Sequence, residues 1–243
     1  MPDAGILVVE HEPLCSVALF GPWLGDAGAE LDVRRPYAGD PLPDDLSDHD
    51  ALLVMGGSMG ADDDAEFGWL SPVKELIRRA AADSVPSLGI CLGHQLAAVA
   101  LGGSVGRNPN GQQLGLLEVG WLTAAADDEL TGRLRTTRRG IQWNDDIVVK
   151  APVRTTVLAR ATTGEIQAAR FAPTVWGVQL HPEADADVIE PWTDSDRRRY
   201  DDDRVDVALR EIAAAVDELE RGWRPLADSL VGLAAASRVE ARR

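Results

Sequence analysis

Cys91 is the residue whose surroundings most clearly favour chemistry. It stands in Gly89-Ile90-Cys91-Leu92-Gly93, between an expected buried strand, Val85 to Ile90, and an expected helix, Leu92 to Leu101. Small residues on both sides allow a sharp strand-to-helix turn that presents the side chain, as in a nucleophile elbow. The amides at the start of the helix favour a thiolate. The pattern predicts a cysteine nucleophile; the alternative is a structural cysteine between two glycines.

A second motif, Val178-Gln179-Leu180-His181-Pro182-Glu183, follows an expected strand. A histidine at a strand end can lie at the carboxyl edge of a parallel sheet, where open α/β proteins place their sites. Pro182 makes the following turn rigid, so that Glu183 can hold the ring and favour its imidazolium form. Alone, this motif is also typical of a surface turn. Together with Cys91 it predicts a Cys91-His181-Glu183 triad.

A glycine-rich stretch, Met55 to Gly60, follows a third expected strand. Its glycines permit positive φ and leave backbone N–H groups uncovered. A phosphate cradle is disfavoured, because the P-loop motif is incomplete and Asp62 to Asp64 would repel phosphate. The Gly57 N–H, with the Leu92 N–H, could instead form an oxyanion hole. An ordinary tight turn is the remaining alternative.

The composition narrows the class of protein. The chain has 243 residues and a formal net charge of −16, which disfavours nucleic-acid binding. No apolar run approaches the ~18 residues that span a bilayer, and the N-terminus lacks the shape of a signal peptide, so we expect a cytoplasmic protein without membrane contact.

With only two cysteines, Cys15 and Cys91, no disulfide framework is expected, and Cys15 is expected to be structural. The four scattered histidines predict no metal site.

The expected elements alternate between strands and helices in the first half and are mostly strands in the second. This order predicts an α/β fold with a mostly parallel sheet and helices on both faces. We expect one domain over residues 1–243, with a core at about 5–190 and a C-terminal helical extension at about 200–243. The charged stretch Asp194 to Arg204 is expected to be a solvated connection or a helix start. Expected strands are 5–9, 30–34, 51–55, 85–90, 115–122, 147–150, 156–161, 165–171 and 175–180, and expected helices are 16–27, 69–83, 92–101 and 205–221.

Three motifs, M-G-G-S-M-G, G-I-C-L-G-H-Q and V-Q-L-H-P-E, occur in this order. Together they resemble the class I glutamine amidotransferases, most closely stand-alone members related to the GMP synthase glutaminase domain. The resemblance covers about residues 5–183 and implies a flavodoxin-like three-layer sandwich with a mostly parallel central sheet. It also implies that Cys91 attacks the side-chain amide carbon of glutamine, that His181 passes a proton to the leaving ammonia, and that water releases glutamate from a thioester. Substrate contacts are implied for Gly56, Gln95 and Asn144.

Two positions depart from the pattern of that family. Asn144 stands where the family usually has histidine, and Gln112-Gln113-Leu114-Gly115 stands where relatives often carry a glutamate before the glycine. Asparagine can form hydrogen bonds but cannot titrate. Because both departures lie outside the triad, they bear on the identity of the substrate more than on the hydrolytic chemistry.

The resemblance implies glutamine or a γ-glutamyl compound as substrate, with no cofactor and no metal. If ammonia is transferred, a separate synthase must accept it, since the sequence shows no P-loop and no unassigned length for a synthase domain. One alternative is a γ-glutamyl peptide or amine hydrolase with the same triad. Another is a non-catalytic regulatory or scaffolding protein, although Cys91, His181 and Glu183 are all present. A cysteine-based redox protein is the least favoured, because it needs no His-Pro-Glu motif.

Overall fold

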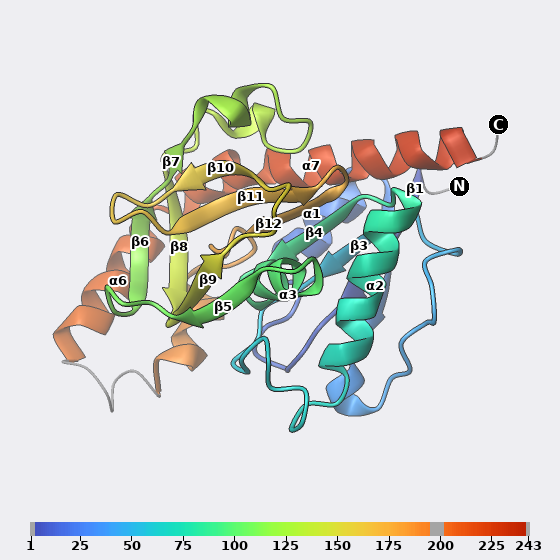
Figure 1. Cartoon of the computed structure of the whole chain (residues 1–243). Helices are drawn as coiled ribbons and strands as arrows, with labels where there is room; N and C mark the ends of the chain where they lie inside the picture. The colour runs from blue at the N-terminus through green and yellow to red at the C-terminus, as the bar shows by residue number, and fades with distance from the viewer. Residues whose placement is uncertain (1–2, 195–201, 242–243) are drawn as a thin grey trace.

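A central sheet of eight strands carries the fold (Figure 1). The computed structural model describes residues 3–194 and 202–241, so the stretch Asp194 to Arg204 lies mostly outside the described residues. The strands are β1 (Ala4–Val9), β2 (Ala29–Arg34), β3 (Ala51–Val54), β4 (Ser87–Ile90), β7 (Gly120–Trp121), β10 (Thr156–Arg160), β11 (Ile166–Ala172) and β12 (Val175–Val178). Their order is β2-β1-β3-β4-β12-β11-β10-β7. Strands from β2 to β12 pair in parallel, and those from β12 to β7 pair antiparallel. The predicted α/β fold with a mostly parallel sheet is confirmed.

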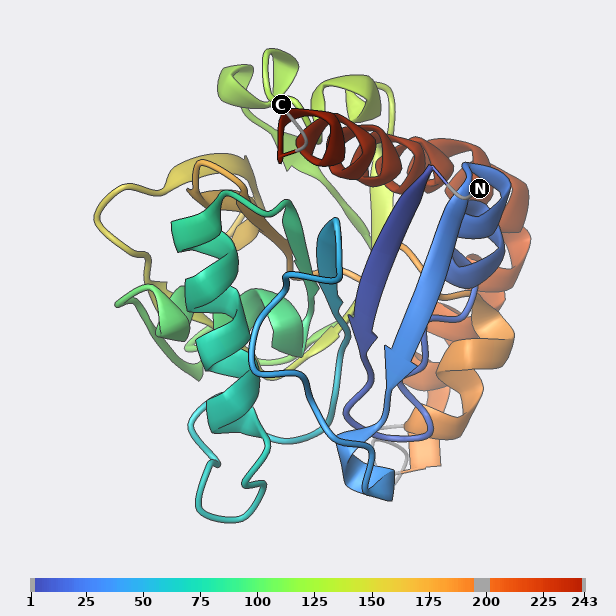
Figure 2. The ribbon, with the colours of Figure 1, turned by 90° about the vertical axis from the view of Figure 1, so that its right-hand side faces the viewer.

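Helices cover both faces of the sheet (Figures 1 and 2). One face carries α2 (Leu70–Asp83) and α3 (Leu92–Ala100), and the other carries α1 (Phe20–Asp26) and α7 (Val216–Ala241). Successive residues of β1 pack on opposite faces of the sheet: Ile6 and Val8 pack with α1 and α7, whereas Leu7 and Val9 pack with α2 and α3. The strand is therefore apolar throughout, as expected for a parallel strand buried on both faces.

The second half forms two further strand pairs beside the main sheet. The expected single strand 115–122 is wrong, because the chain leaves one sheet and joins another at Val119. Hydrogen bonds to different segments hold the two parts: the Val119 N–H donates to the carbonyl oxygen of Arg138 at 2.8 Å, and the Leu122 N–H donates to that of Leu158 at 2.8 Å. Glycine is required at position 120, since a Cβ there would lie 2.1 Å from the carbonyl oxygen of Arg160. Two of these strands, β5 and β8, were not expected from the sequence. The pairs are β5 (Ser104–Arg107) with β9 (Asp146–Lys150), and β6 (Gln113–Glu118) with β8 (Arg139–Asn144).

The first helix begins later than residue 16, where the sequence predicts it. The Val17 N–H donates a hydrogen bond to Glu10 Oε1 at 2.8 Å, and Ala18 has a left-handed φ of 41°. The Leu19 N–H then donates to the carbonyl oxygen of Glu183 at 3.1 Å. These contacts hold residues 16–19 in a loop beside the His181–Glu183 segment, and the helix starts only at Phe20.

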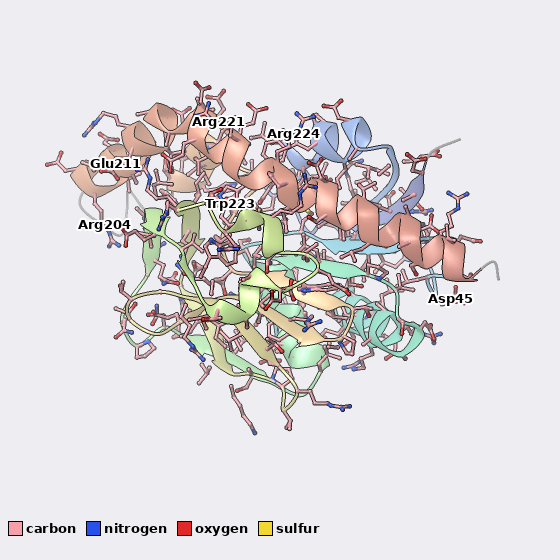
Figure 3. The ribbon with its side chains drawn as sticks, turned by 90° about the horizontal axis from the view of Figure 1, so that it is seen from above. Asp45, Arg204, Glu211, Arg221, Trp223 and Arg224 are labelled. Atoms are coloured by element: carbon pink, nitrogen blue, oxygen red, sulfur yellow. The ribbon has the colours of Figure 1, made fainter. Side chains whose placement is uncertain are left out.

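The C-terminal helical segment is longer than the expected helix 205–221 and is divided at Ala215 into α6 (Asp202–Ala214) and α7. α6 packs on β6, and α7 packs against α1 and β1. Figure 3 shows Trp223 and Arg221 on opposite sides of α7; Trp223 is buried and its Nε1 donates to the carbonyl oxygen of Arg139 at 3.0 Å. Within the described ranges, no helix is long and apolar enough to cross a bilayer. The other helical segments of the described residues are short: α4 (Ala186–Ile189) and 3-10 helices at Pro36–Ala38, Thr123–Ala126, Gly132–Leu134 and Glu190–Trp192.

Candidate active site

Cys91 occupies a sharp turn between β4 and α3. Its φ is 50° and its ψ is −102°, a conformation that is strained for any residue with a side chain. The flanking glycines are sterically required: a Cβ on Gly89 would lie 2.3 Å from the carbonyl carbon and oxygen of Gly93, and a Cβ on Gly93 would lie 2.1 Å from the carbonyl oxygen of Val54. The turn therefore has the geometry of a nucleophile elbow, with the cysteine at the helix N-terminus.

His181 and Glu183 form a buried pair just after β12. The two atoms that join them, His181 Nδ1 and Glu183 Oε1, are 2.8 Å apart, and the side chains are 3% and 1% exposed. The His181 N–H donates to the carbonyl oxygen of Ile141 at 2.8 Å, which fixes the backbone. The Trp192 ring packs against the imidazole with centroids 4.7 Å apart. The histidine ring is thus held by a carboxylate at one nitrogen and by an indole at its side.

The pKa of His181 reflects two opposed effects. Burial by itself lowers this pKa, since it disfavours the charged ring. The negative charge of a Cys91 thiolate and of Glu183 outweighs burial and raises the pKa from 6.5 to about 10. An imidazolium is therefore favoured at neutral pH.

Gly56 brings the two halves of the candidate site together. A Cβ at this position would lie 3.1 Å from His181 Cε1 and 3.7 Å from Cys91 Cβ. The next residue, Gly57, is as closely packed, because a Cβ there would lie 2.9 Å from Leu92 Cδ2 and 3.1 Å from His11 Cβ. The glycine-rich stretch therefore lies directly beside the elbow, with Gly57 against Leu92.

The loop after β1 holds this glycine-rich stretch, and no motif in the sequence predicted this contact. Glu12 Oε1 accepts from the Ser58 N–H at 2.9 Å, and Glu12 Oε2 accepts from Ser58 Oγ at 2.8 Å. Cys15 Sγ donates to Glu12 Oε1 at 3.1 Å. Burial, followed by the Glu12 carboxylate, raises the pKa of the Cys15 thiol above its ordinary value. The raised pKa keeps Cys15, which the sequence predicts to be structural, as a thiol beside Glu12.

A cavity of about 710 Å³ opens above these groups. Of the residues predicted for the site, Gly57, Cys91, Gln95, Asn144 and His181 line it. Glu183 supports His181 from behind and is almost fully buried. The cavity is markedly acidic, although Arg107 pairs with Asp145 at 2.8 Å. The carboxylates in its lining come from Glu12, Asp63, Asp145, Asp146 and Asp194.

The two departures from the family pattern contact each other. Gln113 of β6 and Asn144 of β8 are directly paired in the strand register, and Asn144 Nδ2 donates to Gln113 Oε1 at 3.2 Å. Asn144 Nδ2 also donates to the carbonyl oxygen of Asp146 at 3.0 Å. The two stretches that depart from the family pattern therefore meet in a buried amide pair, Gln113 with Asn144.

His94, from the same motif as Cys91, is a packing residue. Its ring is fully buried and lies against Phe171 with centroids 5.0 Å apart. Burial lowers its pKa to about 4, so the ring is neutral. It stands too close to Gly177 for any side chain there, since a Cβ on Gly177 would lie 2.6 Å from His94 Nδ1.

Comparison with known proteins gives one consistent family. The family model described as glutamine amidotransferase class-I matches residues 24–191. The chain is 34% identical over 159 residues to a subunit of the glutamine-hydrolyzing GMP synthase of Saccharolobus solfataricus, covering 64% of this chain and 77% of the relative. It is 28% identical over 173 residues to gamma-glutamyl peptidase 4 of Arabidopsis thaliana, covering 68% and 66%. The crystal structure of a glutamine amidotransferase from Thermotoga maritima superposes with a TM-score of 0.82 at 23% identity, over 97% of this chain and 99% of that one, which shows a shared fold.

Proposed function

Since the chain belongs to the class I glutamine amidotransferase family, we propose that it hydrolyses the side-chain amide of glutamine, or the amide of another γ-glutamyl compound, through a thioester on Cys91. The observation that carries this proposal is the position of Gly56, which lies against both Cys91 and His181 while Glu183 holds the ring. The arrangement matches what a cysteine hydrolase needs: a nucleophile, a proton donor and an orienting carboxylate.

In the first step the Cys91 thiolate attacks the amide carbon, and a C–S bond forms. The carbonyl oxygen takes the negative charge in the tetrahedral intermediate, and the Gly57 and Leu92 N–H groups stabilise it. Loss of one such donor typically raises a barrier by about 2.7–4 kcal/mol. His181, held as imidazolium by Glu183, then gives its proton to the departing nitrogen, so that the C–N bond breaks and ammonia or an amine leaves.

In the second step His181, now neutral, takes a proton from water while the water oxygen attacks the thioester carbon. The C–S bond breaks, glutamate leaves, and the thiolate-imidazolium pair is restored. Gln95 and Asn144 line the cavity and are proposed, with Gly56, to contact the glutamyl part. If the released ammonia is transferred to an acceptor, the partner is a separate ammonia-accepting synthase. The likeness to one subunit of a GMP synthase supports this possibility.

The size of the cavity favours a second candidate substrate class. Cavities of about 300–1,000 Å³ hold drug-sized ligands, and the cavity of about 710 Å³ is therefore roomier than a glutamine side chain requires. A γ-glutamyl peptide or amine would use the additional volume, and gamma-glutamyl peptidase 4 is among the relatives. The same triad would serve, with an amine as leaving group in place of ammonia.

The test is the release of glutamate from L-glutamine and from a γ-glutamyl dipeptide by the purified protein, with Cys91→Ala as control. Ammonia release that the variant abolishes supports the glutaminase. Faster turnover of the dipeptide supports the peptidase. No turnover of either compound would overturn the proposal if, in addition, a glutamine-like electrophile fails to label Cys91.

A further inference from the structure

Gln179 touches the sulfur of the proposed nucleophile. The residue follows β12, two positions before His181, and its side chain is fully buried. Its backbone N–H donates to the carbonyl oxygen of Gln167 at 2.8 Å, which holds the main chain. Its side-chain Nε2 lies 3.5 Å from Cys91 Sγ, within hydrogen-bonding range of sulfur. None of the roles proposed above uses this contact.

The direction of the Gln179 amide decides whether it helps or opposes a thiolate. An amide can present either its NH₂ group or its oxygen to the sulfur. Only the NH₂ group can donate a hydrogen bond to a thiolate, whereas the oxygen would repel it. The neighbours of Gln179 therefore determine its effect.

Gln95 fixes this direction. Its Nε2 lies 3.0 Å from the carbonyl oxygen of Asp146 and 3.2 Å from Gln179 Oε1. A backbone carbonyl can only accept, so the Gln95 atom that faces it must be the nitrogen. The second hydrogen of that nitrogen requires an acceptor, which makes the facing atom of Gln179 its oxygen. The NH₂ group of Gln179 is thereby left for the sulfur.

Asn144 supports the same backbone carbonyl. Its Nδ2 donates to the Asp146 oxygen at 3.0 Å, as Gln95 Nε2 does. The Asp146 carbonyl oxygen, at the start of β9, thus accepts hydrogen bonds from two side-chain amides. From this oxygen, a chain of hydrogen bonds leads through Gln95 and Gln179 to Cys91. The amides are all neutral, and the side chains of Gln95 and Gln179 are at least 96% buried.

We propose that Gln179 is a further catalytic residue, which donates a hydrogen bond to the Cys91 thiolate, and that Gln95 is a positioning residue, which orients the Gln179 amide. This proposal rests on the proposed function only in taking Cys91 as the nucleophile. The hydrogen bond stabilises the thiolate relative to the thiol, because the Cys91 and Gln179 side chains are both buried, and it keeps the sulfur directed at the substrate. Gln95 accordingly serves the nucleophile in addition to lining the cavity.

The test is the rate of Cys91 alkylation by iodoacetamide between pH 5 and 10, without substrate. Mass spectrometry of the Cys91 peptide separates it from Cys15. The variants are Gln179→Met, which keeps the shape without a donor, Gln179→Glu, which places oxygen at the sulfur, and Gln95→Met. His181 with Glu183, and Cys15 with Glu12, are the titratable groups that interact around Cys91, and all four stay unchanged.

Gln167→Met is the matched control. Gln167 is 1% exposed on the neighbouring β11, its Nε2 donates to the carbonyl oxygen of Glu118 at 2.7 Å, and its Oε1 accepts from the Gly120 N–H at 3.0 Å. Replacement therefore removes two hydrogen bonds of a buried glutamine, as replacement of Gln179 does, without a contact to the sulfur. Circular dichroism confirms that each variant is folded.

For Gln179→Met we expect the alkylation profile to move to higher pH by about one unit, a tenfold loss of thiolate at a fixed pH below the midpoint. Gln179→Glu is expected to move the profile further to higher pH, and Gln95→Met is expected to move it by a smaller amount. In all three variants we expect kcat to fall by a larger factor than KM rises. The proposal is overturned if folded Gln179 variants keep the wild-type profile, or if Gln167→Met shifts it equally. If the Gln179 variants shift the alkylation profile but the protein hydrolyses no γ-glutamyl compound, the role of Gln179 is upheld and the proposed substrates are rejected. If the protein hydrolyses such a compound but the Gln179 variants leave the profile unchanged, the proposed substrates are upheld and the role of Gln179 is rejected.

Discussion

Glu12 holds Ser58 with both of its carboxylate oxygens, at 2.9 Å to the backbone nitrogen and 2.8 Å to the hydroxyl. The two residues belong to the loops that follow neighbouring parallel strands, β1 and β3. Ser58 directly follows Gly57, the proposed oxyanion donor. The carboxylate therefore restrains the segment that carries Gly57, whose N–H is proposed to stabilise the oxyanion.

Replacement of Glu12 should consequently slow turnover. We expect Glu12→Ala to lower kcat about 10-fold, below the ~10²–10³-fold loss on removing a donor itself, because the amide remains but is less well positioned. Glu12→Gln should retain most activity, since its oxygen can accept from the Ser58 N–H while its NH₂ group donates to the hydroxyl. Steady-state kinetics on the substrate found active will measure this. Equal losses in the Gln and Ala variants would show that charge, rather than the hold on Ser58, is what matters.

The elbow should not tolerate a methyl group. Gly93→Ala would place a Cβ 2.1 Å from the carbonyl oxygen of Val54, so we expect destabilisation of at least the ~1–3 kcal/mol typical of overpacking. Gly232→Ala is the control: it lies within α7, nothing lies within 4 Å of its Cβ position, and the helix should gain up to about 1 kcal/mol. Thermal unfolding of the wild type and of both variants measures these two changes in stability. A Gly93→Ala protein as stable as wild type would contradict the close packing of the elbow.

The charge on His181 should make part of the stability depend on pH. Burial lowers its pKa, but Cys91 and Glu183 raise it to about 10, above the ordinary value of 6.5. A raised pKa in the folded state stabilises the fold fully below pH 6.5, and this contribution is lost as the pH rises through about 10. The difference in unfolding free energy between wild type and His181→Gln should thus shrink from pH 6.5 to pH 10 in denaturant titrations. A constant difference across this range would mean that the ring is not charged in the folded protein.

The amide pair of Gln113 and Asn144 should behave as a coupled unit. Gln113→Glu or Asn144→His alone introduces a titratable group opposite a neutral amide, and we expect each to cost about 1–3 kcal/mol of stability. The double variant should recover much of this loss, because the new carboxylate and imidazole face each other across β6 and β8. Urea unfolding of the wild type and the three variants gives the coupling energy. Strictly additive losses would show that the two positions do not interact.

Local sequence was sufficient to predict the central parts of the fold and the candidate site. Apolar runs such as Ile6 to Val9 are confirmed as strands buried on both faces, because burial leaves no position for a polar residue. The elbow at Cys91 could be predicted for a similar reason, since glycines at 89 and 93 are required where the backbone approaches within 2.1–2.3 Å of a Cβ position. His181 and Glu183 were predicted as a pair because only proline separates them.

The sequence by itself thus determined the strands that are buried on both faces of the central sheet, the elbow and the His181–Glu183 pair, whose causes lie within a few residues. Only the tertiary structure decided the support around them. Gln179 reaches Cys91 from 88 positions away, and Glu12 reaches Ser58 from 46. The division of 115–122 between two sheets, and the late start of α1, likewise depend on hydrogen bonds to other segments. Such contacts follow from how strands align in space, which periodicity and local motifs do not encode.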